Sequence, residues 1–190
     1  ALNNGEIDLF QGQATADAVL NFKNIGRATT VGGTNACYEH VDLRVGAAAG
    51  SKTSYTGPFA GMSQKAVDLR TAFLLAYPRA EIIEKIVKPI NSKAVLMNSL
   101  LTFPAESNYA SVIANNGSSK YTAGTQAERT AKALALVKKY FPDAAAGSGS
   151  VKVKLLWGQP SNARRAAEAA LVKAELAKAG FDVTTTGTTG

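Results

Sequence analysis

The clearest hydrophobic pattern lies near the C-terminal end of the chain. In VKVKLLWG, at 151–158, apolar residues occupy every second position, as in a strand that buries one face: Val151, Val153, Leu155 and Trp157. The alanine-rich stretch 159–180 ends at Gly180 and predicts a long helix, and FDVTTT at 181–186 predicts a second strand. A strand, a helix and a strand at this spacing predict a β-α-β unit with parallel strands.

In parallel sheets, ligands bind beyond the carboxyl ends of the strands. Trp157, Gly158 and Gln159 end the first of these strands and are therefore candidate ligand-binding residues. The alternative for Trp157 is a core aromatic at the last inward position of the strand.

Helical periodicity dominates the middle of the chain. Residues 63–77 predict a helix with these inward residues: Val67, Leu69, Ala72, Phe73 and Ala76. Pro78 suits the first turn of a second helix, because the backbone N–H that proline lacks has no intrahelical partner there. Pro89 is predicted to end this helix. A short third helix is predicted at 106–114.

Thr125 and Glu128 match a capping box, in which the two side chains bond the backbone N–H groups that a helix start leaves unpaired. The helix that they open is predicted to run to Tyr140. Its predicted inward residues are Ala127, Ala131, Leu134 and Val137.

The N-terminal part of the chain contains both the two-residue alternation of strands and the periodicity of helices. Ile7 and Leu9 alternate with acidic residues and predict a half-buried strand, TADAVLNFKNIG at 15–26 predicts a short helix, and residues 27–45 are rich in strand-forming residues. The whole pattern predicts an α/β fold with a mixed sheet flanked by helices and a C-terminal β-α-β unit.

Composition narrows the class of protein. The chain has 190 residues, 46% of them hydrophobic, with no run of about 18 apolar residues that could span a membrane. The N-terminal residues have neither the basic start nor the apolar run of a signal peptide. Cys37 is the single cysteine and His40 the single histidine, so we expect no disulfide, no metal site and no cofactor. On a strand, residues three apart point to opposite faces, which disfavours a catalytic Cys37–His40 pair.

The net charge of +7 and the pI of about 9.5 raise a nucleic-acid or anionic partner as the alternative function. Basic residues on the predicted helices, however, are interleaved with glutamates, as on solvated faces: Lys132, Lys138, Lys139, Arg164, Arg165, Lys173 and Lys178. We therefore expect no nucleic-acid partner. Binding that is lost on a modest increase in salt would favour that alternative.

Two motifs could indicate an enzyme, but the residues around each of them argue against that function. GAAAGSKTS at 46–54 looks like a phosphate-binding loop, but Ser51 replaces its second glycine and Pro58 interrupts the helix that must follow. Glu6 and Asp8 are paired carboxylates, but two residues apart on a predicted strand beside a turn they are explained better as polar positions on a solvated face. We expect a protein that is not an enzyme.

Four stretches, in this order, resemble one known family: GEIDL at 5–9, VDLRTAFLLAYPRAEIIEKIV at 67–87, FPAESNY at 103–109 and KLLWGQPSNARRAAEAALVKAELAKAGFDV at 154–183. Together they are similar to the family 5 extracellular solute-binding proteins of ABC transporters, the oligopeptide-binding type. Pro78 departs from the aspartate usual before the helix arginine, and a proline there is similar to actinobacterial members.

The resemblance implies part of a periplasmic-binding-protein-like fold, in which two lobes close on a ligand. It assigns residues 1–36 to the end of lobe one, 37–45 to the crossover and 46–190 to part of lobe two. The implied partners are a peptide or small solute, a membrane permease and the remainder of the same protein, and the implied location is extracytoplasmic, in the periplasm or as a cell-surface lipoprotein. A lone second lobe is expected to bind poorly, with no peptide affinity measurable by calorimetry, because each lobe supplies only part of the contacts.

With the strand-end argument, the resemblance places five residues nearest the ligand: Tyr38 at the crossover, Asn98 and Ser99 in the long connection, and Trp157 and Gln159 at the strand end. For Tyr38, the alternative is a packed strand residue. Asn98 and Ser99 could instead satisfy a turn.

Overall fold

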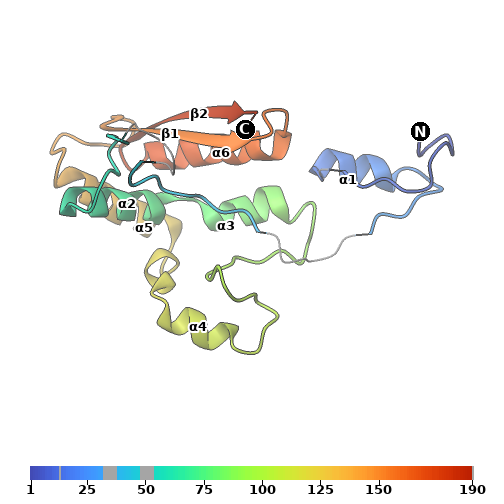
Figure 1. The fold of residues 1–190 in the computed structure, drawn as a ribbon, viewed down its shortest axis with the longest axis horizontal. Coiled ribbons are helices and arrows are strands. Elements are labelled where there is room, and N and C mark those ends of the chain that lie inside the picture. The colour runs from blue at the N-terminus through green and yellow to red at the C-terminus, as the bar shows by residue number, and fades with distance from the viewer. Residues whose placement is uncertain (13, 32–37, 48–53, 190) are drawn as a thin grey trace.

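The computed structural model describes residues 1–12, 14–31, 38–47 and 54–189. Its C-terminal part is the expected β-α-β unit: strand β1, Val151–Gly158, helix α6, Ala163–Ala177, and strand β2, Phe181–Thr188. The strands pair in parallel from Val151↔Phe181 to Gly158↔Thr188, and α6 lies along one face of them (Figure 1). Gly180, at φ 83°, makes the sharp turn from helix to strand.

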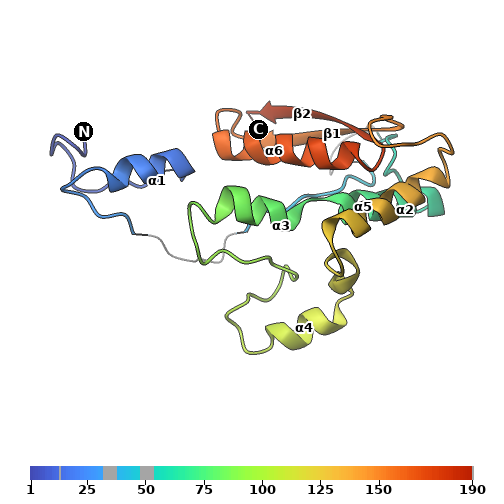
Figure 2. The ribbon, with the colours of Figure 1, turned by 180° about the vertical axis from the view of Figure 1, so that it is seen from behind.

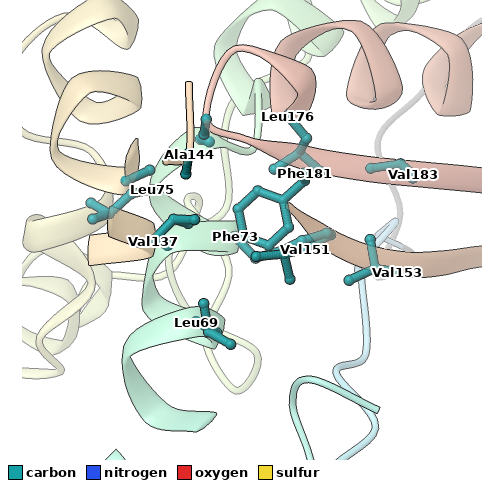
Figure 3. Packing of buried hydrophobic residues seen from close by; sticks show 14 of the residues in the cluster. Leu69, Phe73, Leu75, Val137, Ala144, Val151, Val153, Leu176, Phe181 and Val183 are labelled. Carbon is teal, nitrogen blue, oxygen red and sulfur yellow. The ribbon is translucent and has the colours of Figure 1, made fainter. Parts of the chain in front are cut away.

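Helices α2, Gln64–Ala76, and α5, Gln126–Lys138, pack against each other beside the sheet. Phe73 of α2 meets Phe181 of β2 edge to face, with ring centroids 5.9 Å apart. Figure 3 shows these rings at the centre of a cluster that joins α2, α5, α6 and both strands, and includes Leu69, Val137, Val151, Leu176 and Val183. One core therefore unites the helices of the middle region with the β-α-β unit.

The helix predicted to begin at Pro78 has two parts. An α-helical turn, α3 at Arg79–Ile82, continues as a π-helix, η1 at Ile83–Val87. The short third helix forms as α4, Tyr109–Asn115, and is followed by a 3₁₀ turn, η2, Ser118–Tyr121. The long connection between η1 and α4 contains Asn98 and Ser99 and has no regular element.

The N-terminal helix α1, Ala16–Lys23, forms where the sequence predicts it and has Thr15 as its N-cap. In both views it lies apart from the helices and sheet of the main body (Figures 1 and 2). None of the described residues from 1 to 31 is buried, and Leu9 is 84% exposed.

The strand predicted around Ile7 and Leu9 is wrong, and the described part of 27–45 contains no strand either. Residues 1–6 form turns, with Asn4 and Glu6 donating to the carbonyl of Ala1. Within the described ranges the sheet has two parallel strands, so the predicted mixed sheet is not found there. Alternation predicts a strand only where a neighbouring strand can bond its backbone, and these segments have none in the part that the structure describes.

The prediction of which residues of α5 face inward is also partly wrong. Val137 is buried as expected, but Ala127 and Ala131 are exposed, and Arg129, Thr130 and Ala133 are buried in their place. Alanine fits either face of a helix, so tertiary bonds set the rotation. The Gln126 amide donates to the Ala76 carbonyl of α2, 3.1 Å away, and Thr130 Oγ1 donates to Glu175 Oε1 of α6 at 3.2 Å. Arg129 is held locally: its guanidinium donates to the Gly124 carbonyl and the Gln126 amide oxygen, each at 2.7 Å.

Candidate functional site

The carboxyl end of β1 is a polar turn with strained backbone. Trp157 is half-buried, and its carbonyl accepts a bond from Thr188 Oγ1 at 3.3 Å. Gln159 follows with φ 62°, the one positive value at a non-glycine residue in the described chain. That left-handed conformation costs about 1–3 kcal/mol in a non-glycine residue, and such strain clusters at functional sites. The sequence gives no warning of this strain.

Helix α6 begins at this turn. Asn162 is its buried N-cap, and its Oδ1 accepts a bond from the Arg165 backbone N–H at 3.2 Å. The Asn162 N–H in turn donates to the Gln159 carbonyl at 2.9 Å. The strained turn and the cap together fix where Arg164 and Arg165 leave the first turn of the helix.

Both arginines had been predicted to lie on a solvated face, and that prediction is wrong. Their side chains are 14% and 29% exposed, respectively. Arg164 Nη2 lies 2.5 Å from Glu39 Oε1, and Arg165 Nη2 lies 3.3 Å from the same oxygen. Arg165 Nη1 also donates to the Gly158 carbonyl at 3.1 Å. Glu39 therefore ties the coil segment 38–45 to the end of β1.

Tyr38, beside Glu39, reaches the long connection. Its hydroxyl donates to the Leu100 carbonyl at 3.4 Å, and its ring lies 6.3 Å from that of Phe103. Tyr38 thus adjoins the loop that carries Asn98 and Ser99. It lies in coil and is 36% exposed, so the alternative of a packed strand residue is wrong.

Asn98 is held on three sides. Its Oδ1 accepts a bond from Arg79 Nη2 at 2.8 Å, its N–H donates to the Tyr109 hydroxyl at 2.9 Å, and its carbonyl accepts from Asn116 Nδ2 at 2.6 Å. Ser99 Oγ accepts bonds from the N–H groups of Leu101 and Thr102, each at 3.1 Å, as in a turn. Asn98 is thus rigidly placed, whereas the hydroxyl of Ser99 serves the turn that the sequence allowed as its alternative.

The five predicted residues therefore belong to two neighbouring groups. Tyr38, Asn98 and Ser99 form one, Trp157 and Gln159 form the other, and the contacts of Glu39 with Arg164 and Arg165 join them. Sequence reasoning missed Glu39 and the role of both arginines. One signal was present: two adjacent arginines in the first turn of a helix oppose the helix dipole, which indicates a compensating anion nearby.

Burial and nearby negative charges raise the pKa values of two side chains near this site, Tyr77 and Glu168. Burial, and then the negative charges of Glu168 and Glu39, raise the pKa of Tyr77 to about 12. Burial likewise raises the pKa of Glu168, against the opposing effect of Arg164. The nearest contact between Arg164 and Glu168 is 3.8 Å, too long for a hydrogen bond. The site thus offers fixed positive charge, amides and carbonyls, which suit binding.

Two surface hollows lie elsewhere. One, of about 350 Å³, is lined by residues at the amino ends of the strands, among them Gly149, Lys152 and Asp182. The other, of about 470 Å³, lies between α5, α3 and α6 and is lined by Glu81, Thr130 and Glu175, among others. None of the five predicted site residues lines either hollow.

The described ranges contain no group of three or more His, Cys, Asp or Glu residues that could hold a metal ion. Cys37 and Ser51–Thr53 lie outside those ranges, and the next helix after the glycine-rich loop begins at Gln64, so no helix directly follows that loop. No described helix is long and apolar enough to cross a membrane.

Comparison with known proteins gives no assignment: no family model, no curated protein sequence and no solved structure matches the chain.

Proposed function

We propose that this chain is part of the substrate-binding component of an ABC importer. In this proposal the protein lies outside the cytoplasm, captures a peptide or similar small solute between two lobes and delivers it to a membrane permease. The similarity of four sequence stretches to that family motivates the proposal. The parallel β-α-β unit is compatible with it, because such a unit presents its strand ends to ligands.

One observation supports the location of the ligand-binding site. A chain of hydrogen bonds links three segments far apart in the sequence. Arg165 bonds the Gly158 carbonyl at the carboxyl end of β1, Glu39 bonds Arg164 and Arg165, and Tyr38, next to Glu39, bonds the Leu100 carbonyl in the loop that carries Asn98. These segments carry backbone carbonyls, amides and an aromatic ring. Peptide-binding surfaces need these groups, because they bond the ligand backbone and leave its side chains free to vary.

Trp157 makes this location testable, because it is the only tryptophan of the chain and reports from the site itself. We expect its fluorescence to change saturably when trialanine or pentaalanine is added. A single lobe supplies only part of the contacts, so the dissociation constant should be about 1 mM or weaker. A flat titration with both peptides would refute the proposed site.

Asn98→Ala should weaken this binding roughly threefold to tenfold, the effect of one lost hydrogen bond. Asn21→Ala, an exposed asparagine of α1, is the matched control and should leave the titration unchanged. A single-stranded oligonucleotide tests the alternative: tight oligonucleotide binding that disappears with added salt, without a peptide response, would favour a nucleic-acid-binding protein.

A further inference from the structure

The arginine pair at the start of α6 has one hydrogen-bonded carboxylate partner among the described residues, Glu39. A single oxygen of Glu39 receives a hydrogen bond from Arg164 and another from Arg165. The Glu39 side chain is 44% exposed, the most exposed member of this cluster. The least buried partner of the two arginines is therefore an acid on a coil segment far away in the sequence.

The surroundings of the pair have more hydrogen-bond donors than acceptors. In the described part of the chain, Arg164 Nε, Arg165 Nε and Trp157 Nε1 are buried and have no hydrogen-bond partner. Glu168 is the other acid of the cluster, and its Oε1 also has no partner there. Its nearest contact with Arg164, 3.8 Å, is too long for a hydrogen bond, so Glu168 does not satisfy the guanidinium donors. Such a set of donors favours an additional anionic acceptor.

Replacing one carboxylate by another at this place would leave both guanidinium groups paired. The Arg164 side chain is only 14% exposed, and a largely buried charge that loses its partner is destabilising, so simple loss of Glu39 from the pair is unfavourable. Exchange with an incoming carboxylate avoids that cost. Glu39 can make the exchange more readily than the arginines, because residues 38–45 are coil, without the ladder bonds of a strand.

Resting on the function proposed above, we infer that Glu39 is an internal stand-in for a carboxylate of the solute. A solute with a free carboxylate displaces Glu39 from Arg164 and Arg165 and takes its hydrogen bonds. The same exchange breaks the hydrogen bonds between Glu39, in the segment 38–45, and the first turn of α6. Ligand binding would thus be coupled to the segment that the sequence assigns to the lobe crossover.

Glu39→Gln provides the test, because removing an internal competitor should strengthen binding. We expect the variant to bind trialanine about tenfold more tightly than the unmodified chain, with Trp157 fluorescence as the readout. Trialanine amide, which lacks the carboxylate, should bind at least about tenfold more weakly than trialanine, and Glu39→Gln should not improve its binding.

The matched control is Glu84→Gln, which removes an exposed acid on η1 that is paired with Lys88 and not with the arginine pair. It should leave both titrations unchanged, and circular dichroism should show that both variants remain folded. Weaker trialanine binding by folded Glu39→Gln would overturn the inference and make Glu39 a structural clamp. Equal binding of trialanine and its amide would overturn it while leaving the proposed function standing. No response to either peptide would remove the proposed function as well.

Discussion

At the scale of the residue, Asp68 shows how a charge is accommodated at the edge of the core. It lies on the inward side of α2 and is 8% exposed. Gln64 Nε2 donates to its carboxylate at 2.8 Å, the Tyr140 hydroxyl at 2.9 Å and Lys139 Nζ at 3.3 Å. The bond from Gln64 has the largest effect in lowering the pKa of Asp68, and burial opposes that effect.

Asp68→Asn should therefore destabilise the protein at neutral pH, by about 1.5–3 kcal/mol, the contribution of hydrogen bonds to a charged group. Because the folded pKa of Asp68 lies below its unfolded value, its stabilising effect is complete above the unfolded value of about 3.9. That effect is lost as the pH falls through the folded pKa. Urea unfolding at several pH values between 3 and 7 should show the two proteins converging in stability at the acid end.

Asp143→Asn is the matched control for this measurement, because Asp143 is exposed. It should follow the unmodified protein over the whole pH range. A constant difference between Asp68→Asn and the unmodified protein down to pH 3 would contradict the assigned ionisation and leave only a packing effect.

At the scale of the element, helix α5 depends on local signals for its start and on tertiary contacts for its rotation. Thr125 Oγ1 accepts the Glu128 N–H at 3.2 Å, and Glu128 Oε2 accepts the Thr125 N–H at 2.7 Å. This is the capping box that four residues of sequence predict. No equally local pattern in the sequence shows that Ala133 and not Ala127 lies on the buried face of α5. Alanine has a small side chain that fits either face of a helix, so its position alone does not mark the buried side.

Thr125→Ala should remove the cap and lower the free energy of unfolding by about 1 kcal/mol. For a chain of this size, that corresponds to a fall of roughly 2–4 °C in the melting temperature, measurable by calorimetry. Thr125→Ser keeps an oxygen at the same place and should lie close to the unmodified protein. Equal melting of the Ala and Ser variants would show that the box does not stabilise α5.

At the scale of the whole molecule, one core carries the stability and the N-terminal segment stands outside it. The core cluster draws on α2, α5, α6 and both strands, and no described residue from 1 to 31 belongs to it. In the two ribbon views α1 lies beside the main body and not within its layers (Figures 1 and 2).

Deleting residues 1–31 should therefore leave the free energy of unfolding of the main body unchanged within the error of urea denaturation. Phe181→Ala serves as the positive control: Phe181 is 1% exposed, and its loss should cost about 3–5 kcal/mol. A broad or lost unfolding transition in the truncated chain would show that the N-terminal segment packs on the main body after all.

The sequence by itself determined the elements whose signals are local. Alternation at Val151 and Val153, the Ala-rich stretch and Gly180 were enough for the β-α-β unit, and Thr125 with Glu128 were enough for the start of α5. Backbone geometry and burial repeat over a few residues in such elements, so a short window of sequence contains the information. The sequence also indicated the carboxyl end of β1 as a candidate ligand-binding site, because ligands generally bind at that end of parallel strands.

Only the tertiary structure decided which charges meet. Glu39 and Arg164 are 125 residues apart, and nothing in either neighbourhood names the other. The same holds for the buried face of α5 and for the strands expected at Ile7 and Leu9, which needed neighbours that the described chain does not supply. A pairing between distant segments depends on how the whole core packs, and periodicity records only whether a position faces inward, not what it faces.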